Sequence, residues 1–261
     1  MKKILCLAIA LVMCACVFAS CAQNEDKLIV GYTIYEPMNY EKDGKLVGFD
    51  TELAEAVAKE LGIEVEFKLI QWSNKYLELE SGNVNCLWNG FTSNCADDDG
   101  IQRSEKVDFS HAYMRNEQVV VIRKADESKY ATADSLKGVK GAAEAGSAGE
   151  GVAKGFIGDD SKYTACTAQT ATLTELMGNK VEFVVIDKTM AKTLIGNGNY
   201  ADLMMVESIE IPAEEYSIGF KKGSELTEKV NGALETLAAN GTMTELAEKY
   251  GLENYVITDF N

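Results

Sequence analysis

The chain has 261 residues, of which 46% are hydrophobic and 25% are charged, a composition typical of folded rather than disordered proteins. This length fits one large domain or two medium-sized domains. Its 25 Lys and Arg residues are outnumbered by 41 Asp and Glu residues, so the formal net charge at pH 7 is −16. Because phosphate groups are bound by clustered positive charge, the sequence argues against a nucleic acid partner.

The first twenty residues have the pattern of an export signal. Lys2 and Lys3 precede an uninterrupted apolar run over residues 4–19. A run of this length is near the lower limit for a membrane-spanning helix, so an uncleaved anchor is the alternative. The run ends in FASC and resembles the lipobox of bacterial lipoproteins. This resemblance implies cleavage before Cys21, lipid attachment to that cysteine and a tether over residues 21–26, which anchor the chain to the outside of the cell membrane.

Cysteine and histidine are scarce in the rest of the chain. Three cysteines follow residue 21, namely Cys86, Cys95 and Cys166, so at most one internal disulfide can form. Cys86 and Cys95 are close in sequence and could pair outside the cytoplasm, and the alternative is that they are small buried thiols. The chain has no Cys-x-x-Cys motif and a single histidine, His111. We therefore expect no metal site and no cofactor.

The first part of the body alternates strands with helices. The clearest boundary is Gly62, because apolar residues recur every four residues before it and every second residue after it. This alternation predicts a mostly parallel sheet covered by helices. We predict strands over residues 27–31, 63–69 and 84–89, and helices over residues 51–62 and 73–81.

The same alternation starts again further along the chain, which predicts a second α/β unit. A buried strand ends at Asp187, where a helix follows directly. Near the C-terminus, Thr242 and Glu245 form a capping-box pattern that predicts the start of the last helix. We predict strands over residues 136–142, 181–186 and 216–220, and helices over residues 147–156, 170–178, 188–195, 226–240 and 242–251.

The chain contains, in order, the segments VGFDTELAEAVAKELGIEVEF, WNGFT, RSEKVDFSHAY, EAGSAGE, VEFVVID and EEYSIGFKKGSEL. Together they resemble the bacterial extracytoplasmic amino-acid-binding proteins of solute-binding family 3, which serve ATP-driven importers. The resemblance covers residues 28 to about 250. It implies an α/β fold of the type II periplasmic-binding-protein kind, with two lobes that each contain a mixed sheet flanked by helices, joined by two crossing strands. Chain order then implies one lobe from residues 27–116 and 212–261 and a second from residues 117–211.

The resemblance also implies which charged residues hold a zwitterionic ligand. Burying its carboxylate or its ammonium group without a partner is costly, so each needs an opposite charge. Arg103 matches the family's carboxylate-binding arginine, and its alternative is a solvated surface group. Asp187 matches the acid that accepts the ammonium group, and its alternative is a helix N-cap. Residues 93–102 form an insertion relative to the family, whose Asp97–Asp99 run could lie at the cleft rim or form a solvated loop.

Backbone groups complete the predicted site. The residues Ser147 and Ala148 open a helix whose free amides should attract the ligand carboxylate, while Ser147 caps the helix. The alternative is a cap without a ligand. Gly90 and Thr92 follow a strand end, where the backbone and the Thr92 hydroxyl could contact the α-groups of the ligand.

Aromatic residues are expected to form the walls of the site, although an isolated aromatic near a strand end is often a core residue. In order of preference we expect Tyr35, Trp72 and then Trp88. Family members that bind cationic side chains carry acids at two positions that hold Tyr32 and Asn39 here. This departure disfavours arginine or lysine as the ligand, and Glu36 leaves the question open.

We expect a monomeric, non-enzymatic protein whose lobes close over an L-amino acid and deliver it to the permease of an ABC importer. One alternative is an enzyme on the same scaffold, such as a dehydratase of amino-acid-like acids. The sequence offers it only His111 beside Ser110, without a catalytic motif. A second alternative is a sensor domain that feeds a kinase or channel, and the lack of a later apolar span argues against it.

Overall fold

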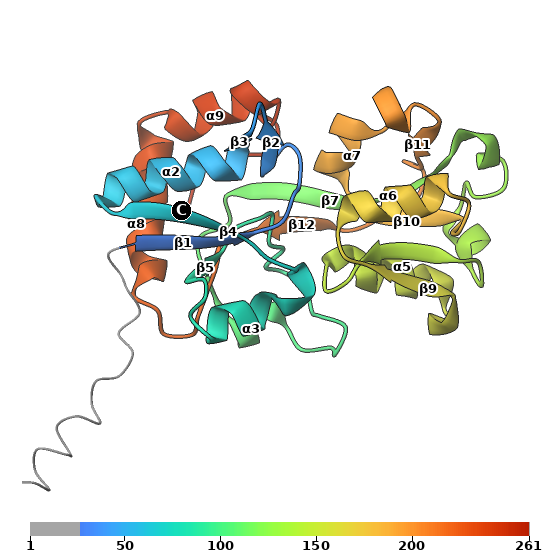
Figure 1. The fold of residues 1–261 in the computed structure, drawn as a ribbon, viewed down its shortest axis with the longest axis horizontal. Helices are drawn as coiled ribbons and strands as arrows, with labels where there is room; N and C mark the ends of the chain where they lie inside the picture. Colours follow the sequence, from blue (N-terminus) through green and yellow to red (C-terminus); the bar gives the residue numbers. More distant parts are fainter. Residues whose placement is uncertain (1–26, 261) are drawn as a thin grey trace, which may run out of the picture.

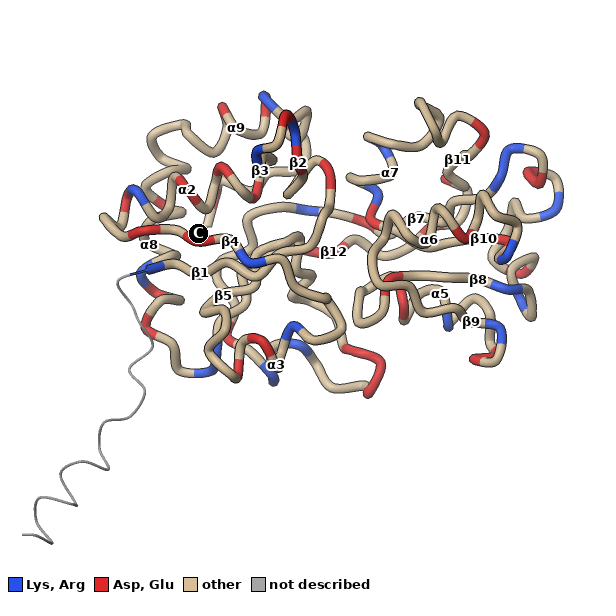
Figure 2. Tube along the Cα trace, in the orientation of Figure 1, with Lys and Arg blue, Asp and Glu red and all other residues tan. Residues whose placement is uncertain are grey.

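The computed structural model describes residues 27–260 as two lobes that lie side by side (Figure 1). The predicted signal peptide, the lipobox and Cys21 lie outside these residues. Two strands run between the lobes, β7 (Met114–Arg123) and β12 (Ala213–Tyr216). No helix within residues 27–260 combines the length and hydrophobicity needed to cross a bilayer. Lys and Arg residues are interspersed with Asp and Glu residues over both lobes (Figure 2), so the net charge is not confined to one of them.

The first lobe contains a five-stranded mixed sheet with the strand order β4-β1-β5-β13-β6. Its first strand pairs in parallel with β4 on one side and β5 on the other, as the alternation of strands and helices predicts. The strand β13 is antiparallel to both of its neighbours. The bounds are β1 (Lys27–Tyr32), β4 (Glu64–Leu69), β5 (Cys86–Leu87), β6 (Asp108–Phe109) and β13 (Gly219–Phe220).

Helices cover this sheet, and a short hairpin, β2 (Tyr40–Lys42) with β3 (Lys45–Val47), lies beside them. The helix α2 ends where predicted, at Gly62 in the left-handed conformation. It begins at Phe49, two residues before the predicted start, so Asp50 lies inside the helix and bonds to other elements. The helices are α2 (Phe49–Leu61), α3 (Lys75–Glu80), α4 (Arg103–Lys106), α8 (Leu226–Ala239) and α9 (Thr242–Tyr250), with a 3₁₀ turn, η1 (Trp72–Asn74), before α3.

The second lobe contains a mixed sheet with the strand order β11-β7-β10-β8-β9. Near its start β7 pairs with β12, and from Gln118 onward it pairs with β10. The predicted lobe boundaries at residues 116/117 and 211/212 fall in or next to these crossing strands. The remaining bounds are β8 (Gly141–Glu144), β9 (Tyr163–Cys166), β10 (Phe183–Asp187), β11 (Leu203–Met205), α5 (Ala148–Ile157), α6 (Gln169–Met177) and α7 (Lys188–Leu194).

Three predicted strands differ from the structure, and the one predicted over residues 84–89 is reduced to β5, Cys86–Leu87. The strand predicted over residues 136–142 begins only at Gly141, because Gly138 has φ +69° and closes a 3₁₀ turn that ends at Leu136. The strand predicted over residues 216–220 is divided into β12 and β13. The division occurs because the Ser217 backbone N–H donates to the Phe91 carbonyl and the Ile218 N–H donates to the Ser110 hydroxyl. Residues 213–220 therefore contribute first to the pair of crossing strands and then to the sheet of the first lobe.

The cysteines Cys86, Cys95 and Cys166 are free thiols, and Cys86 and Cys166 are buried. The predicted alternative of buried thiols therefore describes Cys86, which lies in β5. Burial raises the pKa of the Cys86 thiol above its ordinary value. Such a thiol stays neutral and unreactive at neutral pH.

Candidate ligand-binding site

A cavity lies between the lobes beside the crossing strands. Each lobe contributes half of its lining, and most of the predicted ligand-binding residues take part; Tyr35 does not. The first lobe contributes Trp72, Asn89, Gly90, Thr92 and Arg103, and the second contributes Glu144, Ser147, Ala148, Gln169 and Asp187.

Arg103 is the first residue of α4, and its side chain is only 1% exposed, so it is not a solvated surface group. Its Nη1 donates to the Thr92 carbonyl at 3.1 Å, and its guanidinium lies over the ring of Phe91. Its Nη2 donates to the Gly146 carbonyl of the second lobe, also at 3.1 Å. Arg103 thus reaches across the gap between the lobes.

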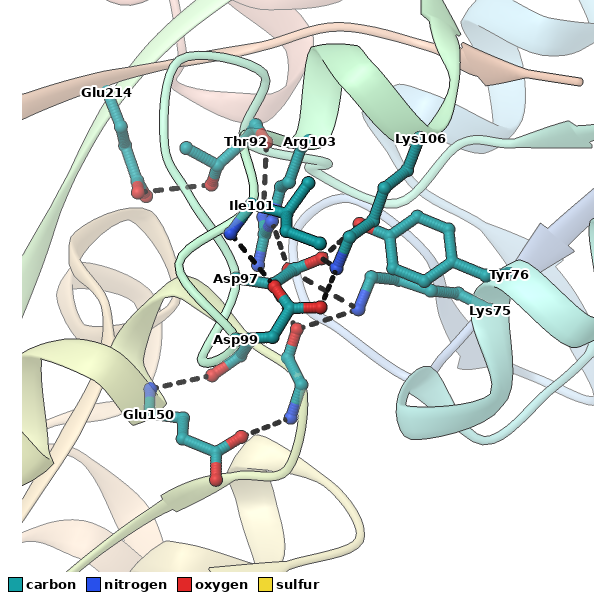
Figure 3. A network of polar contacts seen from close by, with 12 residues as sticks. Lys75, Tyr76, Thr92, Asp97, Asp99, Ile101, Arg103, Lys106, Glu150 and Glu214 are labelled. Atoms are coloured by element: carbon teal, nitrogen blue, oxygen red, sulfur yellow. Dashed lines mark hydrogen bonds and ion pairs between the residues drawn. The ribbon is translucent and has the colours of Figure 1, made fainter. Parts of the chain in front are cut away.

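The insertion over residues 93–102 is partly exposed, but its Asp97 bonds to Arg103, which lines the cavity (Figure 3). Its Asp97 accepts from Arg103 Nε and Lys106 Nζ, both at 2.8 Å, and from the Tyr76 hydroxyl at 2.5 Å. Burial alone would raise the pKa of Asp97, but the charge of Arg103 and these hydrogen bonds hold the pKa at about 2. Asp98 forms an ion pair with Lys154 on α5 at 2.6 Å, so the insertion also contacts the second lobe.

Asp187 ends β10, and its carboxylate faces amide side chains rather than capping α7. Its Oδ1 accepts from Asn116 Nδ2 at 2.9 Å and from Gln118 Nε2 at 2.5 Å, and its Oδ2 accepts from Gln169. The N-cap alternative is therefore wrong as far as the side chain is concerned. Burial raises the pKa of Asp187 above its ordinary value.

Glu214 on β12 lies next to Asp187 and is a residue that the sequence analysis missed. It accepts from Asn116 and Gln118, the same amides that donate to Asp187, and from the Thr92 hydroxyl at 3.0 Å. Burial and the charge of Asp187 raise its pKa to about 8. The sequence held one signal: Asn116 and Gln118 recur at a period of two at the start of an apolar run, which is typical of a strand with one polar face.

Two more charged residues were missed. Glu144, the last residue of β8, is buried, and its Oε1 has no hydrogen-bond partner among residues 27–260. Burial and the charge of Asp187 raise its pKa to about 8. Lys75 is also buried and donates to the Gly146 carbonyl at 2.9 Å. Burial and the nearby positive charge of Arg103 lower its pKa to about 8.

The start of α5 is capped as predicted. The Ser147 hydroxyl accepts from the Glu150 backbone N–H, and the Glu150 carboxylate accepts in return from the Gly146 N–H at 2.6 Å. Two groups predicted to be free for a ligand are already bonded in the first lobe or the crossing strands. The Gly90 N–H donates to Asp50 at 2.9 Å, and the Thr92 hydroxyl donates to Glu214.

Of the three aromatic residues expected to form the walls of the site, one lines the cavity and two lie outside its lining. Trp72 lines the cavity, whereas Trp88 is fully buried in the first-lobe core beside Tyr113. Tyr35 lies behind Gly90, and its hydroxyl bonds to Thr189 and, at 2.8 Å, to the hydroxyl of Tyr216. Tyr35 therefore connects the two lobes and the strand β12.

The residues considered above for ligand selectivity or for catalysis do not line the cavity; they are Tyr32, Asn39 and His111. Tyr32 packs against Phe67, and Asn39 bonds to Asn89 and Thr51, so neither side chain lines the cavity. His111 lies 3.0 Å from Glu235 and stacks on Phe260, outside the cavity lining. Within residues 27–260 no three His, Cys, Asp or Glu side chains are grouped to hold a metal ion.

Comparisons with known proteins agree with this architecture. Residues 28–253 match the family described as bacterial extracellular solute-binding proteins, family 3. The chain is 27% identical over 252 residues to the arginine-binding extracellular protein ArtP of Bacillus subtilis, covering 94% of each chain. It is 28% identical over 235 residues to the L-cystine-binding protein TcyJ of Escherichia coli K12, covering 85% of this chain and 82% of TcyJ.

Its structure resembles that of an ancestral arginine-binding protein bound to glutamine. The TM-score is 0.78 at 31% sequence identity, covering 88% of this chain and 99% of the other. The predicted two-lobed α/β fold is thereby confirmed. The chain belongs to the bacterial extracellular solute-binding proteins of family 3.

Proposed function

We propose that this protein binds an L-amino acid between its two lobes outside the cytoplasm and delivers it to the permease of an ABC importer. The observation that carries the proposal is that Arg103 and Asp187, both buried, line one cavity from opposite lobes. A guest with a carboxylate and an ammonium group would place an opposite charge beside each, with its carboxylate sharing Arg103 with Asp97. Arginine and cystine, for which the relatives above are named, share these two groups with glutamine, the ligand bound in the solved structure, and the three differ in their side chains.

The positive half of the cavity suits the carboxylate. Arg103 offers a planar fork of N–H donors, and Lys75 contributes a second positive charge close by. The helix α5 begins at Ala148 in the lining, and the partial positive charge of a helix N-terminus attracts anions.

The negative half of the cavity suits the ammonium group. Asp187 is held in position by three amide donors, so its orientation is fixed before a ligand arrives. Glu144 lines the same half with a carboxyl oxygen that has no partner within the described residues. A hydrogen-bond donor on the ligand would satisfy it, so we expect a side chain that carries N–H groups.

Entry of the ligand requires the lobes to separate. Lys75 and Arg103 of the first lobe both donate to the Gly146 carbonyl of the second, and Tyr35 bonds to Thr189 across the same gap. These contacts must break in an open form and re-form around the ligand. A rotation about β7 and β12, the strands that join the lobes, would achieve this.

The proposal includes a lipid anchor at Cys21, a monomeric state and the permease as the protein partner. Cleavage before Cys21 followed by diacylation would hold the protein at the outer face of the membrane. Mass spectrometry of the mature N-terminus in the native host tests this, with Cys21→Ala as the control. An unmodified N-terminus would contradict the anchor without affecting ligand binding.

Calorimetric titration of the purified protein with each of the twenty amino acids tests the central proposal. We expect at least one Kd of order micromolar, about −8 kcal/mol. Asp187→Asn should weaken binding by roughly 2–5 kcal/mol, whereas Asp160→Asn, at an exposed aspartate, should not. A lack of binding to every amino acid would refute the proposal. Mass spectrometry should recover the ligand unchanged, and loss of water from it would favour the dehydratase alternative.

A further inference from the structure

Two buried carboxyl groups share the same two hydrogen-bond donors beside the crossing strands. Asn116 Nδ2 lies 2.9 Å from Asp187 Oδ1 and 2.5 Å from Glu214 Oε1. Gln118 Nε2 lies 2.5 Å from Asp187 Oδ1 and 2.8 Å from Glu214 Oε1. Two oxygens this close to the same two nitrogens must lie close to each other. Both side chains are more than nine-tenths buried.

The groups packed around this pair are almost all neutral or acidic. Amide and hydroxyl donors come from β7, α6 and the segment after β5, namely Asn116, Gln118, Gln169 and Thr92. The titratable neighbours are Tyr35, Tyr216, Glu144 and Cys95. Within residues 27–260 no Lys, Arg or His side chain forms an ion pair or hydrogen bond with Asp187 or Glu214.

Two adjacent buried carboxylates without a cation repel each other and lose their hydration, so such a pair retains a proton at neutral pH. The shifts in pKa agree with this: burial raises the pKa of both groups, and the charge of Asp187 further raises that of Glu214, to about 8. Asp187 lines the cavity and Glu214 does not. Glu214 can therefore act on a ligand only through the lining residues it adjoins, Asp187 and Thr92.

We propose that Asp187 and Glu214 hold one shared proton without a ligand and release it when the ligand's ammonium group reaches Asp187, so that binding is coupled to proton release. This inference rests on the proposed function. The released proton goes to solvent, the ammonium group keeps its three protons, and no covalent bond between heavy atoms changes. The added positive charge replaces the lost one, so the net charge of the site is the same before and after the exchange. Glu214 is a positioning residue in this scheme.

The proposed proton release fixes the direction in which ligand affinity changes with pH. Because protonation of the pair opposes binding, the affinity rises with pH wherever a proton is released, by up to about tenfold per pH unit for one proton. Glu144 and Lys75 also line or border the cavity and titrate in the same range, each with a pKa of about 8. Proton release by the wild type alone would therefore not identify its source, and a comparison with Glu214 variants is required.

The experiment measures proton release by calorimetry at pH 7 and pH 8, each in two buffers of different ionisation enthalpy. The probe is the tightest-binding standard L-amino acid other than histidine and cysteine, whose side chains titrate near this range. We expect the wild type to release up to about one proton. Glu214→Gln should still bind and should lose most of this release, while Glu215→Gln, its partly exposed neighbour on β12, should behave as wild type.

Equal proton release by wild type and Glu214→Gln would overturn the inference. If Glu214→Gln fails to fold, infrared spectroscopy of Glu144→Gln at pH 8 provides the readout, because this variant lacks the other lining carboxyl group of raised pKa and ligand addition should then remove the band of the shared proton. Persistence of that band, with no proton release in calorimetry, would also overturn it. Binding without proton release counts against this inference alone, whereas a lack of binding to all amino acids counts against the proposed function.

Discussion

Arg103 of the first lobe donates to the backbone carbonyl of Gly146 in the second lobe, with Nη2 3.1 Å from the oxygen. The Lys75 ammonium group donates to the same oxygen at 2.9 Å. One carbonyl thus receives two positive side chains from across the gap. Because Gly146 lies just before the helix α5, this contact joins the start of α5 in the second lobe to Lys75 and Arg103 in the first.

We predict that Arg103→Ala weakens ligand binding by roughly 2–5 kcal/mol, because the ligand carboxylate loses its bidentate partner in a buried site. Arg103→Lys should recover only part of the loss, since an ammonium group keeps the charge without the planar fork. Calorimetric Kd values for both variants check this. Arg115→Ala, which removes an exposed arginine from β7, is the control. Wild-type affinity in Arg103→Ala would mean that the carboxylate binds elsewhere.

The ion pair between Asp98 and Lys154 also joins the lobes, but it should contribute little. Asp98 is 56% exposed, and exposed ion pairs contribute about 0.2–1 kcal/mol. We expect Asp98→Asn to weaken ligand binding by no more than about fivefold, and the loss to shrink further at high salt. Asp134→Asn, which breaks the exposed Asp134–Lys137 pair within the second lobe, should leave the Kd unchanged. A hundredfold effect of Asp98→Asn would instead make the insertion part of the binding site.

Gly90 is tightly constrained by its surroundings. Its φ is +61°, and a Cβ there would lie 2.8 Å from the ring of Tyr35 and 2.9 Å from that of Tyr216. We predict that Gly90→Ala destabilises the protein by more than the roughly 1–2 kcal/mol of the left-handed conformation alone. Gly44→Ala is a matched control, because Gly44 has φ +72° and a Cβ added to it would meet no atom within 4 Å. Denaturant titration should show a clearly larger loss of unfolding free energy for Gly90→Ala than for Gly44→Ala. Equal losses would show that the rings of Tyr35 and Tyr216 move to make room for the added methyl group.

The sequence could predict that Arg103 and Asp187 line the cavity, because each lies at a fixed distance from a recognisable motif on its own lobe. Lys75 lies outside the recognised segments, whereas Glu144 and Glu214 open the segments EAGSAGE and EEYSIGFKKGSEL and were nevertheless missed. Their burial depends on elements that the crossing strands bring together from distant parts of the chain. Lys and Glu side chains are usually solvated, so residue type alone argued against burial of all three.

Distant partners also explain why two groups that were expected to be free for a ligand are bonded within the protein. The Thr92 hydroxyl and the Gly90 N–H were expected to contact a ligand, but they bond to Glu214 and Asp50. Both partners come from other segments of the chain, and neither pairing has a local sequence signal. Strand β7 was also not predicted as such, although its apolar run and its polar first half are visible in the sequence.

The raised pKa values of the buried acids predict how stability depends on pH. Burial raises the pKa of Glu144 from 4.5 to about 8, so the folded chain binds this proton more tightly than the unfolded chain does. The folded state then holds more protons between about pH 4.5 and 8, and the free energy of unfolding must fall as pH rises through this window. Glu214 contributes with the same sign. The pKa of Lys75 is lowered from 10.5 to about 8, so the folded chain binds this proton less tightly than the unfolded chain does. Lys75 therefore also lowers the free energy of unfolding at neutral pH. This loss becomes smaller as the pH rises above about 8.

We predict that Glu144→Gln reduces the loss of stability between pH 5 and pH 8, because the amide cannot ionise. The pKa shift sets an upper limit of roughly 5 kcal/mol on the change, and relaxation of the site will lower it. Denaturant titrations of the ligand-free protein at both pH values measure it. Glu60→Gln, at an exposed position on α2, should follow the wild type. If Glu144→Gln loses as much stability as the wild type over this range, Glu144 is already ionised in the folded protein, and a nearby cation such as Lys75 must compensate its charge.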